Sequence, residues 1–164
     1  MNKTIVVYGS STGTCQAIAE KVAGELGCEA IDVQSLNDDV VKENTNLVLG
    51  TSTWGAGEMQ DDWYDGIKVL QGADLNGKVI ALFGCGDAES YCDTFCGGMG
   101  ELYNGIKDSG ATFVGSVSVD GYNFDDSEAV VDGQFVGLAL DDVNEDDKTD
   151  ERIQAWINSF KDKL

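Results

Sequence analysis

The amino-acid sequence predicts one α/β domain over residues 1–164, built on a doubly wound, five-stranded parallel sheet with helices on both faces. Two observations lead to this prediction. Short runs rich in β-branched residues alternate with stretches of helical periodicity along the chain, which is the pattern of repeated βαβ units. The length suits a single core, because 164 residues can bury a two-sided sheet but leave too little chain for a second domain.

Five short apolar runs are expected to form the strands of this sheet. They cover residues 5–8, 30–33, 47–49, 79–83 and 113–119. An insertion is expected to split the last strand, because residues 120–134 are polar and contain glycine, whereas residues 135–140 resume a strand-like pattern. The dense acidic run at 141–150 has the composition of a solvated loop.

Four stretches with apolar residues at helical spacing are expected to cover the sheet. They cover residues 15–26, 63–70, 95–106 and 153–164. Gly27 is the expected C-terminal stop of the first helix. Thr149 is the expected N-cap of the last helix, because Asp150 and Glu151 follow it where the helix dipole favours acids.

The chain is strongly acidic, with 10 Lys and Arg against 30 Asp and Glu and a formal net charge of −20. This charge repels the phosphate backbone, so nucleic acid is excluded as a partner. It favours proteins with basic docking surfaces, although acidity also serves solubility alone. No apolar run reaches the roughly 20 residues of a membrane span, and the chain start passes directly into the first strand. We therefore expect a cytoplasmic protein without membrane insertion.

Histidine is absent from the sequence, and five cysteines are present. These are Cys15, Cys28, Cys85, Cys92 and Cys96. Without a histidine or a CxxC pair we expect no metal site and reduced thiols. The lack of histidine also removes the Ser-His and Cys-His dyads of hydrolases. Any reactivity is therefore expected to come from a cofactor.

A loop of small hydroxyl residues joins the first strand to the first helix. It runs Gly9-Ser10-Ser11-Thr12-Gly13-Thr14-Cys15. The N–H groups of a first helical turn, the positive end of the helix dipole and the hydroxyls can together hold a phosphate without a cation. The lysine of the G-x-x-x-x-G-K-S/T motif is missing, so a monophosphate fits better than a nucleoside triphosphate. The alternative is an ordinary Gly/Ser turn with a capping hydroxyl.

Two further glycine-containing loops follow the third and fourth strands. They cover residues 51–58, which include Trp54, and residues 84–91, which include Tyr91. In a parallel sheet both loops leave the same carboxyl edge as the first loop, where ligands of open α/β folds bind. An aromatic ring in such a loop suits stacking on a planar ligand, with core packing as the alternative for each ring.

These three loops, in this order and spacing, resemble those of the flavodoxin family, and the resemblance covers the whole chain. The family's phosphate signature, Ser/Thr-x-Thr-Gly-x-Thr, is matched by Ser10, Thr12 and Gly13, whereas Cys15 stands in place of the last Thr. Residues 120–122 and 135–141 are similar to the insertion of the long-chain branch. The resemblance implies the strand order 2-1-3-4-5, for which this family is itself the standard example.

The resemblance implies that one flavin mononucleotide (FMN) binds between Trp54 and Tyr91 and that the protein supplies no catalytic residue of its own. The implied cofactor-binding residues are Ser10, Ser11, Thr12, Gly13, Thr14, Cys15, Thr51, Ser52, Thr53, Trp54, Gly55, Ala56, Gly57, Cys85, Gly86, Asp87, Tyr91 and Asp93. The backbone carbonyl of Gly55 would turn to accept a hydrogen bond from flavin N5 after one-electron reduction, which glycine permits at low cost. A thiol donates a poorer hydrogen bond than a hydroxyl, so Cys15 is expected either to weaken one phosphate contact or to pack as a buried thiol.

The resemblance further implies a monomeric, low-potential one-electron carrier that uses the semiquinone/hydroquinone couple. Its partners would be redox proteins with basic docking surfaces, such as flavin reductases or low-potential oxidoreductases. The alternative is an FMN-dependent NAD(P)H quinone or azo reductase of the same fold, but rings on both flavin faces would leave no room for hydride transfer. A phosphoacceptor receiver domain would need acidic residues where this chain has Gly9-Ser10 and Gly50-Thr51.

Overall fold

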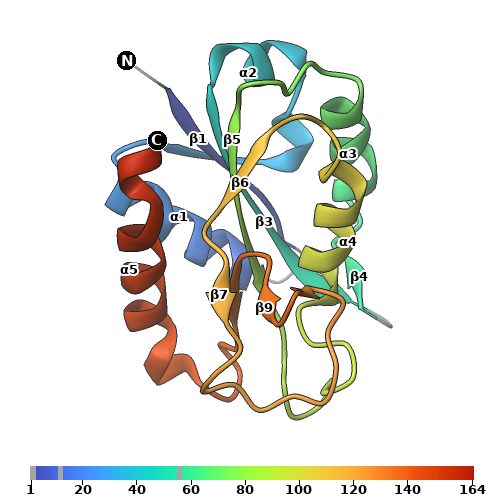
Figure 1. Ribbon diagram of the computed structural model, residues 1–164, viewed down its shortest axis with the longest axis vertical. Coiled ribbons are helices and arrows are strands. Elements are labelled where there is room, and N and C mark those ends of the chain that lie inside the picture. The colour runs from blue at the N-terminus through green and yellow to red at the C-terminus, as the bar shows by residue number, and fades with distance from the viewer. Residues whose placement is uncertain (1–2, 11–12, 55–56) are drawn as a thin grey trace.

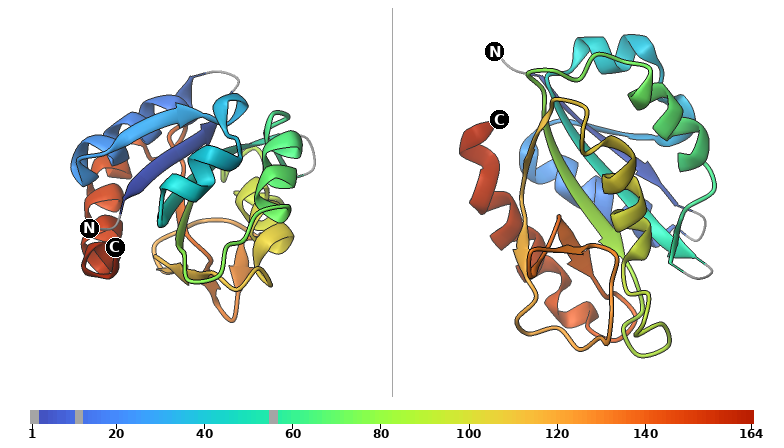
Figure 2. Two further views of the ribbon diagram at one scale, coloured as in Figure 1. Left: turned by 90° about the horizontal axis from the view of Figure 1, so that it is seen from above. Right: turned by 45° about the vertical axis from the view of Figure 1, so that its right-hand side comes forward.

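The computed structural model describes residues 3–10, 13–54 and 57–164, with only the backbone of Trp54 included. It places one twisted sheet between two layers of helices (Figures 1 and 2). The central strands are β1 (Thr4–Gly9), β2 (Glu29–Asp32), β3 (Asn46–Trp54), β5 (Val79–Cys85), β6 (Thr112–Val114) and β10 (Leu138–Leu140). A two-residue strand, β4 (Glu58–Met59), folds back antiparallel on the end of β3.

The parallel strands follow the order β10-β5-β3-β1-β2. Both β6 and β10 pair in parallel with β5, β6 along its first half and β10 along its second. They therefore occupy one strand position that is split into two pieces, with the intervening chain forming a small antiparallel sheet. This arrangement confirms the doubly wound order 2-1-3-4-5 and the predicted insertion in the last strand.

The predicted boundaries of the last strand were wrong in detail. The run 113–119 breaks at Gly115, which has a φ of +82° and lies where any Cβ would approach Trp156 Nε1 to 2.5 Å. The chain then leaves the central sheet and forms the antiparallel order β7-β9-β8. These strands are β7 (Val117–Ser118), β8 (Val130–Val131) and β9 (Gln134–Phe135).

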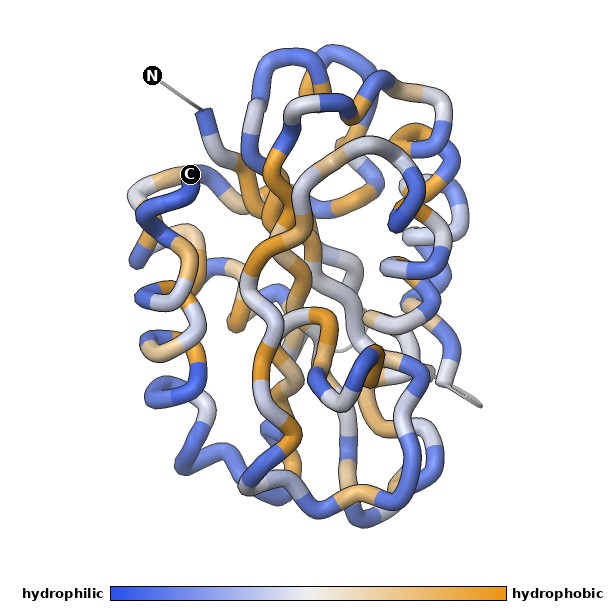
Figure 3. Tube along the Cα trace, in the orientation of Figure 1, coloured by the Kyte–Doolittle hydropathy of each residue, from blue (hydrophilic) through white to orange (hydrophobic). Residues whose placement is uncertain are grey.

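Helices α1 (Thr14–Leu26) and α5 (Thr149–Phe160) cover one face of the sheet, as Figure 2 shows. The other face is covered by α3 (Trp63–Gln71), α4 (Gly97–Ile106) and the short α2 (Asp38–Glu43), which the sequence pattern did not predict. The described part of the chain also contains three 3-10 turns, η1 (Val33–Ser35), η2 (Asp146–Lys148) and η3 (Lys161–Lys163). Two apolar clusters of described residues, one on each face, fill the space between the sheet and the helices. Figure 3 shows that the hydrophobic residues are concentrated along the central strands.

Two predictions at helix starts were also wrong. Thr149 is the first residue of α5 rather than its N-cap, because η2 precedes it and Lys148 takes the cap position. The Thr149 hydroxyl instead donates to Asp142 Oδ1 at 2.9 Å. Helix α4 begins at Gly97, two residues after the predicted start at Phe95. Among the described residues, no helix combines the length and the apolar character that crossing a bilayer requires.

Candidate cofactor site

A cleft of about 230 Å³ opens at the carboxyl edge of the sheet, among the segments that follow β1, β3, β5 and β10. Of the predicted cofactor-binding residues that the structure describes, seven line it, namely Thr14, Ser52, Thr53, Cys85, Gly86, Asp87 and Tyr91. Three further lining residues were not predicted, namely Thr94, Asp142 and Val143. The parallel sheet thus brings all three predicted loops to one cleft, as expected for loops that leave the carboxyl edge of parallel strands.

The start of α1 lies at one end of this cleft. Gly13 has a φ of +92°, which glycine adopts without a Cβ penalty, and its N–H donates to Ser10 Oγ at 3.0 Å. Ala17 makes the first intrahelical bond, to Gly13 O at 3.0 Å. The N–H groups of residues 14–16 therefore precede the intrahelical ladder and lie where an anion is favoured.

The Cys15 side chain is fully buried in the apolar cluster between α1 and the sheet. The neighbouring Cys85 thiol, together with burial, raises the pKa of Cys15 well above its usual value. The thiol is therefore neutral at physiological pH and adds no negative charge beside a phosphate. This placement fits the packing role for Cys15, while its backbone N–H belongs to the helix start.

We expect Cys15→Thr to leave FMN affinity within about threefold of the parent and to lower the free energy of unfolding by about 1–3 kcal/mol. The side chain of residue 15 is fully buried in the apolar cluster and is not among the described residues that line the cleft, so a hydroxyl there loses its water without reaching the phosphate. Fluorescence titration of the apoprotein with FMN and urea unfolding measure the two effects. Cys15→Val is the matched control, since it has the shape of threonine without the hydroxyl, and a tenfold gain in affinity for threonine but not for valine would contradict the packing role.

The end of β3 and the hairpin that follows it are held by polar side chains of β3 and by α4. The buried Thr51 hydroxyl donates to Ser52 O at 2.8 Å and accepts from Gln60 N at 2.9 Å. Thr53 Oγ1 accepts from Gly98 N at 3.1 Å. Gly97 lies so close to this hairpin that a Cβ would stand 2.7 Å from Gly57 O. Thr51 and Gly57 thus shape the hairpin rather than line the cleft.

Some predicted site residues cannot be placed in this geometry. Ser11, Thr12, Gly55 and Ala56, and the Trp54 side chain, lie outside the described residues. The expected flavin contacts of Trp54 and Gly55 therefore stay predictions. Asp93 is exposed and is not among the described residues that line the cleft.

The segment after β5 presents Tyr91 at the rim of the cleft. The Tyr91 side chain is 56% exposed, and its backbone N–H donates to Asp87 O at 2.9 Å. The backbone N–H of Ser90 and the amide of Asn144 lower the pKa of Asp87 below its usual value. Asp87 is therefore ionised at neutral pH and places a negative charge in the cleft wall.

Asp142 and Val143 add a fourth segment to the cleft, which the sequence analysis treated as a solvated acidic loop. They follow β10, the second piece of the split strand, and so leave the sheet at the same edge as the other loops. Val143 is 69% exposed. The signal that could have found them is their position directly after the strand-like run 135–140.

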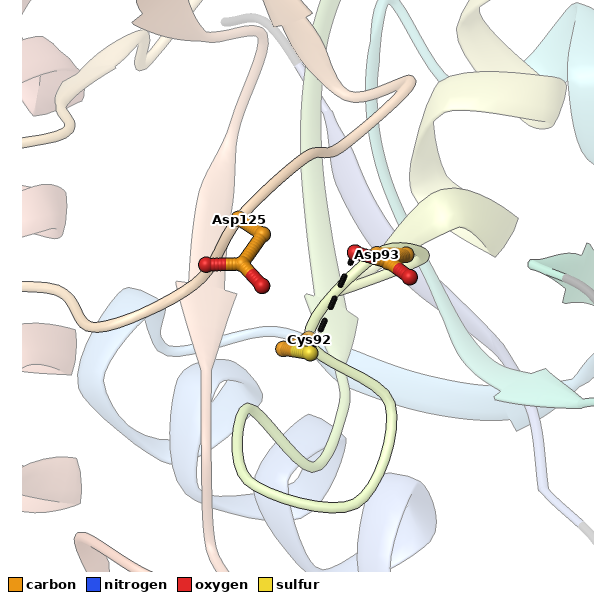
Figure 4. A group of neighbouring side chains, drawn as sticks. All are labelled: Cys92, Asp93 and Asp125. Carbon is orange, nitrogen blue, oxygen red and sulfur yellow. Dashed lines mark hydrogen bonds between the residues drawn. The ribbon is translucent and has the colours of Figure 1, made fainter.

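Cys92, Asp93 and Asp125 form a cluster beside this site, shown in Figure 4. Their potential ligand atoms lie within 4.8 Å of one another, and Cys92 Sγ is 3.9 Å from Asp93 Oδ1. A hydrogen bond with Asp125 raises the pKa of Cys92 and disfavours the thiolate that a metal would need. Both carboxylates are exposed, so we assign no metal to this cluster.

Comparison with known proteins gives a consistent result. The family model for flavodoxin matches residues 6–156. Flavodoxin 1 of Azotobacter vinelandii is 44% identical over 171 residues, which cover 100% of this chain and 98% of that protein. Flavodoxin of Nostoc sp. is 38% identical, with 100% and 99% covered. The crystal structure of Fusobacterium nucleatum flavodoxin bound to flavin mononucleotide superimposes with a TM-score of 0.93 at 30% identity, covering 100% of this chain and 99% of that one.

The split fifth strand, the helix start at the carboxyl edge and the aromatic rim of the cleft agree with these matches along the full length of the chain. The chain belongs to the flavodoxin family of electron-transfer flavoproteins.

Proposed function

We propose that this chain binds one FMN in the cleft at the carboxyl edge and carries single electrons between protein partners. One observation supports the site above all others. The most exposed large hydrophobic side chains of the described residues are Val143 and Tyr91, at 69% and 56%, and both line the same cleft. Apolar and aromatic side chains gathered in one cleft beside a few polar groups are typical of a cofactor site.

The two ends of the cleft suit the two ends of FMN. The helix start at Thr14 offers backbone N–H groups and the positive end of the α1 dipole to the phosphate. Tyr91 offers a ring face to the isoalloxazine. FMN supplies the redox chemistry when bound, and the residues of the chain position it and set the electrostatic environment.

The charges around the cleft favour a low potential for the second electron. Asp87 and Asp142 lie in the cleft wall, and the chain as a whole has a net charge of −20. The second one-electron step adds a negative charge at this place, which the carboxylates oppose. Tyr91 stacked on the bound ring would keep water from one of its faces, so solvent would screen that charge less than in open water.

We expect the potential of the second one-electron step to become less negative as ionic strength rises from about 10 mM to about 500 mM, because salt shortens the Debye length from about 30 Å to about 4 Å. Spectroelectrochemical titration of the FMN-loaded protein at several salt concentrations measures both potentials. The first step is the internal control, since it is coupled to proton uptake and adds no net charge. An unchanged second potential would contradict the electrostatic explanation.

The proposal extends to partners and location. Redox proteins with basic surfaces, such as flavin reductases or low-potential oxidoreductases, complement the acidic rim of the cleft. All five cysteines are free thiols, which is typical of a reducing compartment and supports the cytoplasm. The central sheet with a core on each face supports a single domain, and we propose that it acts as a monomer.

Steady-state oxidation of NADPH by the purified FMN-loaded protein tests the carrier function against the reductase function. If the chain is a carrier, no NADPH should be oxidised in the presence of this chain and a quinone alone, and oxidation should begin only after a flavoprotein reductase is added. Turnover by the protein alone would assign it to the quinone or azo reductases of the same fold. The same assay with cytochrome c as a one-electron acceptor should show electron flow that depends on both the reductase and this chain.

A further inference from the structure

We infer that Asp141 and Asn144 are positioning residues that hold two walls of the cofactor cleft at a fixed separation. The inference rests on the proposed FMN site and assigns a function to two residues outside the cleft lining. One wall is the segment after β5, with Asp87 and Tyr91, and the other is the segment after β10, with Asp142 and Val143.

Asp141 is a buried acid at the end of β10, with 1% of its surface exposed. Its Oδ1 accepts from Asn144 N at 2.9 Å and from Val143 N at 3.2 Å, which shapes its own segment. Its Oδ2 accepts from Ala88 N at 3.1 Å, across the sheet edge in the neighbouring segment. Burying a carboxylate is costly unless hydrogen bonds replace its water, and these N–H groups supply them from both walls.

The Asn144 side chain forms a second link between the same two walls. Its Nδ2 donates to Asp141 Oδ2 at 2.9 Å and to Asp87 Oδ1 at 2.8 Å. Both neighbours are carboxylate oxygens, which only accept hydrogen bonds, so the donating nitrogen of the amide group and not its oxygen must face them. One amide group therefore bridges two acids that would otherwise repel each other, and it uses both of its hydrogens to do so.

The two links fix the residues that face the cofactor. Asp142 and Val143 lie between Asp141 and Asn144, so both ends of this short wall are anchored. Asp87 O accepts the backbone N–H of Tyr91, so the bridge from Asn144 to Asp87 reaches the segment that presents the tyrosine ring. Loss of the bridge is expected to let the two walls separate and to admit water beside the bound ring.

The test compares Asn144→Ala with the parent protein in FMN titration of the apoprotein and in redox titration of the FMN-loaded form. We expect FMN binding to weaken on the order of tenfold, because part of the binding free energy is then used to bring the two separated walls back together. We expect the potential of the second one-electron step to become less negative, because water entering the cleft stabilises the added charge. Urea unfolding of the apoprotein should shift to somewhat lower urea, since the lost hydrogen bonds lie within the chain, whereas a purely structural role would leave both potentials unchanged.

Two further variants make the test specific. Asn104→Ala removes an exposed asparagine from α4 outside the cleft lining and should leave affinity and both potentials unchanged. Asn144→Asp keeps the side-chain size but places a third carboxylate beside Asp87 and Asp141, so it should weaken FMN binding more than alanine does. A side chain that only filled space would give the opposite ranking.

The outcomes separate this inference from the proposed function. If the parent protein binds FMN and passes through a one-electron intermediate, but Asn144→Ala matches it in affinity and in both potentials, the positioning role is wrong and the function stands. If the parent protein itself shows no FMN binding or no one-electron intermediate, the proposed function fails. Weaker binding and a shifted second potential in Asn144→Ala, with the parent behaving as a carrier, support both.

Discussion

Tyr91→Ala is expected to weaken FMN binding by about 10- to 100-fold, because stacking of an aromatic ring on a flat heterocycle is worth about 1–3 kcal/mol. Tyr91 lines the cleft and is 56% exposed, so its ring has a free surface for the cofactor to cover. Titration of the apoprotein with FMN, in which quenching of the flavin fluorescence reports binding, measures the change in affinity.

The controls for Tyr91 separate stacking from stability. Tyr91→Phe keeps the ring and should retain nearly all of the affinity. The free energy of unfolding of the Tyr91→Ala apoprotein should remain within about 0.5 kcal/mol of the parent, because exposed side chains contribute little to folding. Equal FMN affinity for alanine and tyrosine would place the flavin elsewhere than against this ring.

Gly137→Ala is expected to destabilise the protein by about 3 kcal/mol or more, the largest stability effect that we predict. A Cβ at this position would lie 2.0 Å from Leu82 O and 2.6 Å from Leu82 C, both in the backbone of the central strand β5. Backbone atoms of a central strand cannot move aside as a flexible side chain can. The strand pairing between β5 and β10 must therefore open.

Urea unfolding monitored by tryptophan fluorescence measures the effect of Gly137→Ala, and FMN affinity should fall with it, since β10 leads directly into Asp142 and Val143. Gly24→Ala is the matched control, for which the expected change in the free energy of unfolding has the opposite sign. Gly24 lies inside α1 with open space around its Cβ position, so alanine should stabilise the helix by about 0.5–1 kcal/mol. A loss at Gly137 no larger than that of an ordinary surface substitution would contradict the close packing of β10 on β5.

The fold was predictable from the sequence where local pattern and topology agree. Alternating strand and helix patterns gave the parallel sheet, and the polar stretch 120–134 predicted the split of its last strand. The end of β6 was not predictable, because the break at Gly115 reflects its positive φ and the packing of Trp156, which is distant in sequence. The six-residue helix α2 is too short for a clear periodic signal, and the Asn37 side chain that caps its start is the local feature that marks it.

The candidate site was predictable where the loops follow the carboxyl ends of parallel strands, because ligands of open α/β folds bind at that edge. This principle correctly predicted that Thr14, Ser52 and Tyr91 line one cleft. The segment after β10, which contributes Asp142 and Val143 to the cleft, could not be predicted from the acidic composition of residues 141–150. A buried acid such as Asp141 is indistinguishable in sequence from the exposed acids around it. Its burial depends on N–H donors from a segment more than 50 residues away, at Ala88.

The visible spectrum of the FMN-loaded protein during stepwise anaerobic reduction with dithionite tests the one-electron carrier function directly. We expect the yellow oxidised form to pass through a blue species that reaches its maximum near one electron per flavin, and further reductant to bleach the blue species at a much lower potential. Loss of the yellow colour in a single two-electron step, with no blue intermediate at any point, would contradict a one-electron carrier.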